Sequence, residues 1–151
     1  MRNLMPLFVA VAIVSRPALA GDVEKTVAQK DAWSARARML EEKTRAVKDA
    51  CGAQVTATFD KSSYAAFDPL VDRTEAPCRD VLNTLVALCA SPAGKAGVAK
   101  VREVSCRFSS VGTKLTFEGH TLKVWIDPAK SSIEGLKKGS SSWKSALEEL
   151  L

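Results

Sequence analysis

The chain has 151 residues, of which 46% are hydrophobic and 26% charged, with a formal net charge of +5. The 131 residues that remain without a 20-residue leader are within the size of one domain and enough to bury a core. The basic residues alternate with acidic ones along the sequence, whereas a nucleic-acid-binding protein would have a one-sided basic stripe. We therefore expect no nucleic-acid partner.

Residues 1–20 have the three parts of a secretory signal peptide. A short positive start precedes an apolar run at 4–14, and Ala18-Leu19-Ala20 is a small-x-small cleavage site. The apolar run is too short for a membrane span, which needs about 20 residues. We predict cleavage before Gly21, a single exported domain at 21–151 with no membrane span, and a periplasmic or extracellular location. An uncleaved N-terminal anchor is the alternative.

Four cysteines follow the leader, at positions 51, 78, 89 and 106. An even number of cysteines in an exported chain indicates two disulfides, and no Cys-x-x-Cys redox motif is present. Cys78 and Cys89 would lie about 16 Å apart along one helix, too far for a bond. Cys51 and Cys89 are expected at one end of the domain. We predict the pairs Cys51–Cys89 and Cys78–Cys106.

The first part of the mature chain favours a long helix and then a strand. Residues 22–51 are rich in helix formers, and Gly52 suits the helix end. The expected inward positions of this helix are Trp33, Ala37, Leu40, Thr44, Val47 and Cys51. Its first turns continue this stripe weakly and are expected to overhang the domain. The alternation at 54–60 predicts a half-buried strand with Val55, Ala57 and Phe59 inward.

An irregular stretch at 64–75 then leads to a second helix at about 75–90. Tyr64 and Phe67 are expected to anchor the stretch to the core, and Thr74 or Asp72 to cap the helix. The expected inward positions of the helix are Cys78, Val81, Leu82, Leu85, Leu88 and Cys89. Ser91-Pro92 predicts the start of a short helix that ends near residue 100.

Three strands are predicted at 102–110, 114–118 and 121–127, and a last helix after Ser142. The Gly119-His120 link suits a type II′ turn. The pattern predicts an antiparallel meander. The expected fold is therefore α+β, with a long N-terminal helix and further helices packed on a small, mostly antiparallel sheet in the order helix, strand, helix, three strands, helix, stapled by two disulfides.

His120 is the only histidine, and its place at a hairpin tip argues against a Ser-His or Cys-His nucleophile. A zinc site would need thiolates that export should oxidise. We expect no catalytic residue, metal or cofactor. The acidic residues Asp60, Asp68, Asp72 and Glu75 could form a carboxylate pair for hydrolysis, but turn and capping roles are favoured for them.

The outward positions of the three strands form the candidate binding surface. They are Glu103, Ser105, Arg107, Lys114, Thr116, Glu118, Thr121, Lys123 and Trp125. The site residues expected there are Trp125, Lys123, Arg107, Lys114 and Glu118, because Trp and Arg dominate binding hot spots. A helix covering Trp125 is the equally weighted alternative.

These features predict an exported binding module, inhibitor or accessory protein that is not an enzyme. We expect its partner to be a protein or an envelope component, bound through the sheet face or the Ser/Gly-rich loop at 135–142. One alternative is a small hydrolase that uses the Asp60 to Glu75 carboxylates. Another is an assembly protein that dimerises through Val23 and Val27 on the first helix.

Overall fold

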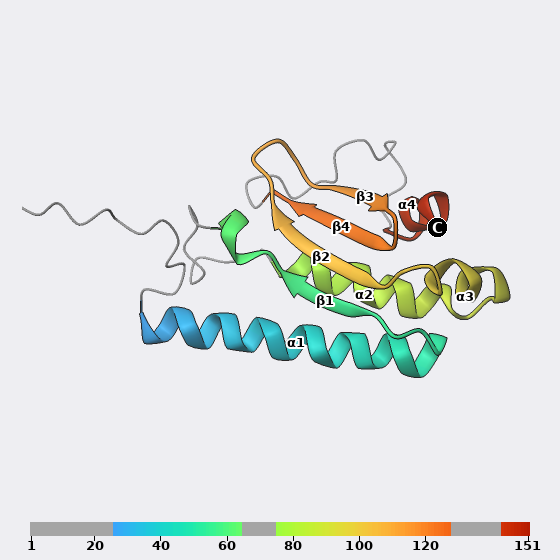
Figure 1. Cartoon of the computed structure of the whole chain (residues 1–151), viewed down its shortest axis with the longest axis horizontal. Coiled ribbons are helices and arrows are strands. Elements are labelled where there is room, and N and C mark those ends of the chain that lie inside the picture. The colour runs from blue at the N-terminus through green and yellow to red at the C-terminus, as the bar shows by residue number, and fades with distance from the viewer. Residues whose placement is uncertain (1–25, 65–74, 128–142) are drawn as a thin grey trace, which may run out of the picture.

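The computed structural model describes residues 26–64, 75–127 and 143–151, so the leader lies outside the described residues. The elements are α1 (Val27–Cys51), β1 (Thr56–Phe59), the 3-10 turn η1 (Lys61–Tyr64), α2 (Ala76–Leu88), α3 (Pro92–Val98), β2 (Glu103–Phe108), β3 (Lys114–Glu118), β4 (Thr121–Ile126) and α4 (Trp143–Leu150). Figure 1 shows the sheet packed against the long helices. The predicted α+β class and the order of the elements are confirmed.

The four strands form one sheet in the order β1-β2-β4-β3. The β1–β2 and β2–β4 pairs are parallel and only β3–β4 is antiparallel, so the expected mostly antiparallel meander is wrong. The β1–β2 connection passes through α2 and α3, the kind of long crossover that a parallel pair needs. The more apolar β4 takes the inner place beside β2, which leaves β3 at the edge.

The hairpin between β3 and β4 has the predicted turn. Gly119 has a φ of 63°, and none of the described residues other than glycine has a positive φ. A positive φ at the first turn position alone is the mark of a type II′ turn. Gly119 thereby allows the two strands to pair in register from Glu118 and Thr121 onward.

Both ends of α1 are capped by side-chain and backbone bonds. Thr26 and Gln29 form a reciprocal capping box, and Gly52 adopts a left-handed conformation with its N–H donating to the carbonyl of Lys48 at 2.8 Å. Trp33, Leu40 and Val47 are buried as predicted, while Thr44 and Cys51 are half-buried.

The prediction that Ala37 of α1 faces the core is wrong. Ala37 is exposed, and the preceding residue, Arg36, is 4% exposed. Arg36 reaches Glu75 at the start of α2, with 3.3 Å between its Nε and the carboxylate Oε2. An apolar pattern alone does not reveal this burial, because a charged side chain enters the interior only where a partner receives it.

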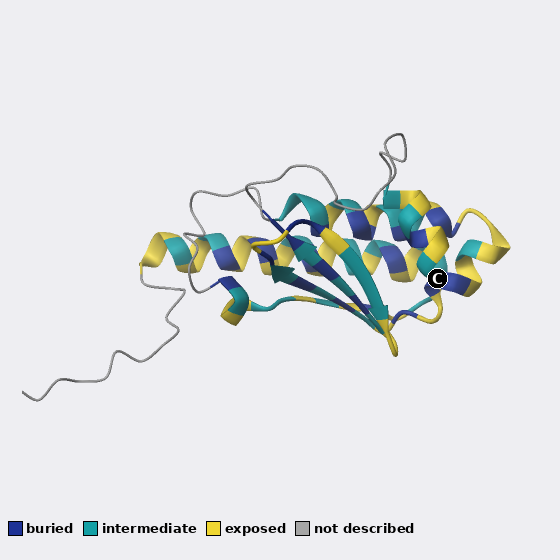
Figure 2. Cartoon of the chain, turned by 90° about the horizontal axis from the view of Figure 1, so that it is seen from above, coloured by how far each residue is buried: buried dark blue, intermediate teal, exposed yellow. Residues whose placement is uncertain are grey.

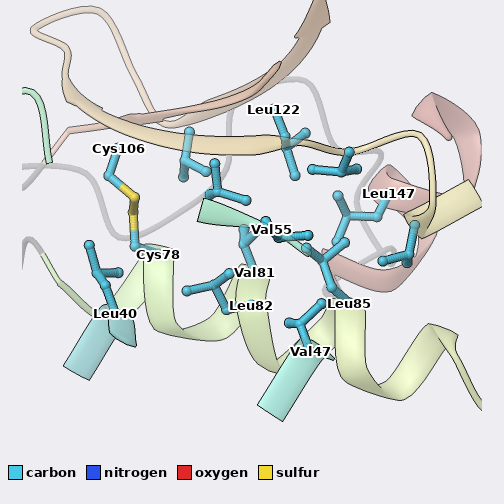
Figure 3. Packing of buried hydrophobic residues seen from close by; sticks show 14 of the residues in the cluster. Leu40, Val47, Val55, Cys78, Val81, Leu82, Leu85, Cys106, Leu122 and Leu147 are labelled. Carbon is cyan, nitrogen blue, oxygen red and sulfur yellow. A yellow bond between two sulfur atoms is a disulfide. The ribbon is translucent and has the colours of Figure 1, made fainter. Parts of the chain in front are cut away.

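The core lies between one face of the sheet and the helices α1, α2 and α4. Figure 3 shows Val81, Leu82 and Leu85 of α2 between Leu40 and Val47 of α1 and the sheet above them. All six predicted inward positions of the second helix are buried. At Leu85 and its neighbours, burial of apolar area contributes about 1.5–3 kcal/mol per large side chain.

Two disulfides fasten this core, and both predicted pairs are confirmed. Cys51–Cys89 has a Cα–Cα distance of 5.3 Å and Cys78–Cys106 one of 6.2 Å. The first joins the end of α1 to the end of α2. The second joins the start of α2 to β2, which fixes the helix across the sheet.

The N-terminal turns of α1 extend past the ends of the strands, as Figures 1 and 2 show. Val27 in the first turn is 76% exposed, so the predicted overhang is confirmed. No helix among the described residues is both long and apolar enough to cross a membrane.

The predicted anchor Tyr64 and the predicted helix cap Ser91 are confirmed. Tyr64 is 1% exposed, and the Ser91 hydroxyl accepts from the N–H of Gly94 as a helix cap. Glu75 takes the cap position of α2 without a side-chain cap bond. The predicted anchor Phe67, the predicted caps Asp72 and Thr74, and the Ser/Gly-rich loop at 135–142 lie outside the described residues.

Candidate binding face

Alternate side chains of the sheet point away from the helices and form a polar surface. The outer face, as we call it, comprises Thr56, Thr58, Glu103, Ser105, Arg107, Lys114, Thr116, Glu118, Thr121, Lys123 and Trp125. The intervening residues Val104, Leu122 and Val124 are fully buried in the core. None of the described helices packs on the outer face, because α1, α2 and α4 all contribute to the core on the other side.

Trp125 occupies the middle of one row across this face. The register places Arg107 of β2 and Lys114 of β3 directly beside it on the two neighbouring strands. The Arg107 Cζ lies 5.4 Å and the Lys114 Nζ 5.5 Å from the centre of the indole ring. Both are cation–π distances, at which the ring is attracted to positive charge. The indole N–H donates to the Thr116 hydroxyl at 3.4 Å, and the ring remains half-buried.

Asp60 extends this row beyond the end of β1. Its Oδ2 accepts from the Nε and Nη2 of Arg107 at 2.9 and 2.6 Å. The Ser62 hydroxyl donates to its other oxygen. The Ser62 hydrogen bond and then the Arg107 guanidinium hold the pKa of Asp60 below its ordinary value, against the opposing effect of burial. The carboxylate thus fixes the guanidinium that lies against Trp125.

A second ion pair on the outer face joins β3 and β4. Lys123 Nζ donates to Glu118 Oε2, and this contact lowers the pKa of Glu118. Thr121 donates to Glu103 at 3.4 Å in the adjacent row. Cross-strand pairs of this kind favour the pairing of the strands that carry them. They also hold the side chains of the outer face in defined positions.

The structure brings all five predicted site residues together on the outer face. Trp125 is half-buried, and none of the described helices lies over it. The sequence prediction missed Asp60 as a member of this row. Asp60 directly follows the first strand in the sequence. This position indicates that Asp60 belongs to the row of Trp125 only once β1 and β2 are known to be parallel.

The carboxylates considered for hydrolysis do not form a pair among the described residues. Asp60 binds Arg107 and Glu75 binds Arg36, while Asp68 and Asp72 lie outside the described residues. A general acid needs a raised pKa, but the pKa of Asp60 is lowered. The surroundings of Asp60 and Glu75 therefore give no support to acid–base chemistry.

His120 lies exposed in the hairpin turn, with its Nδ1 2.9 Å from the carbonyl oxygen of Lys100. Within the described ranges, no three His, Cys, Asp or Glu side chains are grouped as metal ligands would be. The predicted position of His120 at the tip of a hairpin is confirmed.

An aromatic group that was not predicted from the sequence lies between α1, the end of β1 and the end of η1. Trp33 packs edge-on against Phe59 and Tyr64, with ring centres 5.8 and 5.6 Å away. Arg36 and Lys61 place their charges 5.0 and 5.8 Å from the centre of the Trp33 ring. Trp33 itself is 4% exposed, so this group is part of the core rather than a binding surface.

No protein-family model, curated protein or solved structure matches the chain. The function is therefore inferred from the geometry of the outer face.

Proposed function

We propose that this protein is an exported binding module, without enzymatic activity, that binds a protein or an envelope component through the outer face. The observation that carries the proposal is Trp125, half-buried among charged side chains on a sheet face that no described helix covers. Tryptophan and arginine are the residue types that contribute most to binding energy at protein interfaces. Here they are adjacent, on the two inner strands of the sheet.

The bonds around Trp125 support this role because they order the surface before a partner arrives. The carboxylate of Asp60 accepts a hydrogen bond from Arg107, and the Thr116 hydroxyl accepts one from the indole N–H of Trp125. A side chain that is already held in place loses little conformational entropy on binding, which otherwise costs about 0.5–1.5 kcal/mol per residue. The outer face thus combines a large apolar ring with charged groups of fixed position.

The two disulfides support export, since such bonds form and persist in oxidising compartments. We propose the periplasm or the extracellular medium as the location, with residues 1–20 as the signal peptide. Export and binding together suggest an inhibitor or accessory role at the cell envelope.

The decisive experiment is photo-crosslinking from the outer face, followed by direct binding measurements. A photoreactive amino acid at Thr58 or Ser105 would capture the partner in an envelope extract, and the partner would then be purified. Trp125→Ala should weaken its binding by about 2 kcal/mol or more, roughly 30-fold in Kd, as for a hot-spot tryptophan.

Trp143→Ala is the matched control, because Trp143 is also half-buried but lies on α4 away from the outer face. Its effect on binding should be small in protein that remains folded. Equal loss of binding in both variants, or an unchanged Kd in folded Trp125→Ala protein, would contradict the proposal.

A further inference from the structure

The edge of the sheet at β3 carries backbone groups that the binding proposal does not use. β3 pairs with β4 on one side only, and it is the last strand of the sheet. Glu118 and Thr121 flank the two-residue turn and form a hydrogen-bonded pair. Because such pairs recur at every second residue of an antiparallel ladder, Thr116 and Lys114 are also hydrogen-bonded to β4. The backbone N–H and C=O groups of Leu115 and Phe117 consequently point away from β4.

Within the described ranges, these outward groups make no backbone hydrogen bond. Apart from bonds within the sheet and helices, the backbone hydrogen bonds there include none from Leu115 or Phe117. An unpaired row of this kind is a template for another strand. The opposite edge, at β1, is shorter and carries no charged side chain to direct a partner.

The charges on β3 favour one arrangement of a second strand. Lys114 and Glu118 both lie on the outer face and are exposed, with Thr116 midway between them. A parallel, in-register copy would place lysine beside lysine and glutamate beside glutamate. An antiparallel copy centred on Thr116 would place each lysine beside a glutamate and Leu115 opposite the partner's Phe117, so that their free backbone groups can bond.

We propose that β3 pairs antiparallel with β3 of a second copy of this chain, in a two-fold symmetric dimer centred on Thr116. Lys114 then faces the partner's Glu118, and Glu118 faces the partner's Lys114. The two four-stranded sheets join into one, with both outer faces on the same side. This inference does not depend on the proposed function, because the edge can pair whether or not the outer face binds a partner.

The test is the mass of the disulfide-bonded protein, measured by sedimentation velocity over a range of concentrations. The wild-type protein should form a dimer, and Lys114→Glu or Glu118→Lys should each raise its dissociation constant about tenfold or more, because each change places two pairs of like charges opposite one another. An equimolar mixture of the two variants should dimerise again, since glutamates on one chain then meet lysines on the other. The double variant K114E/E118K should also dimerise.

Lys144→Glu is the control for the change in net charge, because Lys144 is an exposed residue of α4, with a side chain 59% exposed. It should leave the dimer unchanged, and near-ultraviolet circular dichroism would confirm that each variant is folded. A wild-type monomer at every concentration would overturn the proposal. So would a dimer that resists both charge reversals, which would instead use another surface such as the first turn of α1, or a mixture that fails to restore the dimer.

Discussion

The two tryptophans at 33 and 125 have similar charged neighbours and very different surroundings. Trp33 has Arg36 and Lys61 at its ring, and Trp125 has Arg107 and Lys114, at comparable distances. Trp33 is also enclosed by Phe59 and Tyr64, and it is buried. Trp125 has only polar and charged neighbours across the strands and stays half-buried.

This difference shows that cation–π contacts do not determine the role of a tryptophan here. Around Trp33 the apolar neighbours exclude water, so the ring contributes mainly to folding. Around Trp125 the neighbours are charged, and Arg107 is held by its ion pair with Asp60, so part of the ring stays accessible to a partner. The two sites should therefore respond in opposite ways in folding and binding experiments.

The largest effect is expected for Trp33→Ala. Removing this buried ring leaves a cavity between Phe59 and Tyr64, which should lower the free energy of unfolding by about 3–5 kcal/mol. Urea unfolding followed by circular dichroism measures the change. A loss below 1 kcal/mol would mean that the aromatic group around Trp33 is open to solvent.

Trp125→Ala is the matching change on the outer face and should cost only about 1 kcal/mol of folding stability, through lost cross-strand contacts. Its main effect is the weakened binding described above. The same urea experiment separates the two roles. If both alanine variants lost equal stability, Trp125 would belong to the core and the comparison would fail.

The sequence predicted the elements well because their signals are local. The periodic apolar positions of 75–90 and the Gly119-His120 turn depend only on nearby residues, and both are confirmed. The disulfides also followed from distances along expected elements. These predictions needed no knowledge of which strands are neighbours.

Strand pairing and the buried charge could not be predicted in the same way. Whether β4 pairs with β2 or lies at the edge depends on how completely each strand is buried in the assembled core. Arg36 is buried because Glu75, 39 positions later, meets it across two helices. Both are properties of the tertiary structure. Which residues share the outer face was nevertheless predictable, because alternation along each strand does not depend on the order of the strands.

Asp60→Asn tests whether the row around Trp125 is held by charge. The change removes the ionic part of the two hydrogen bonds from Arg107 and should lower the free energy of unfolding by about 1 kcal/mol at neutral pH, since the pair is partly exposed to solvent. Urea unfolding at several pH values measures this difference between the wild-type protein and the variant.

The pH dependence of that difference has a definite sign. The pKa of Asp60 is lower in the folded protein than its ordinary value of 3.8, so the ionised form is favoured by folding. The stabilisation should therefore be constant above about pH 5 and decline as the pH falls below 3.8 toward the folded-state pKa. A difference that stays constant down to pH 2 would contradict an ionic role.

The smallest effect is expected for His120→Asn, which provides a baseline for both tryptophan sites. His120 is exposed, and its ring is hydrogen-bonded to the carbonyl of Lys100. Its backbone carbonyl, which accepts from the N–H groups of Arg102 and Glu103, is kept in the variant, and asparagine is well tolerated in tight turns. Stability should change by less than about 0.5 kcal/mol, as at ordinary surface positions, and binding to the partner should be unchanged. A large loss of binding in folded His120→Asn protein would move the binding surface from Trp125 to the hairpin tip.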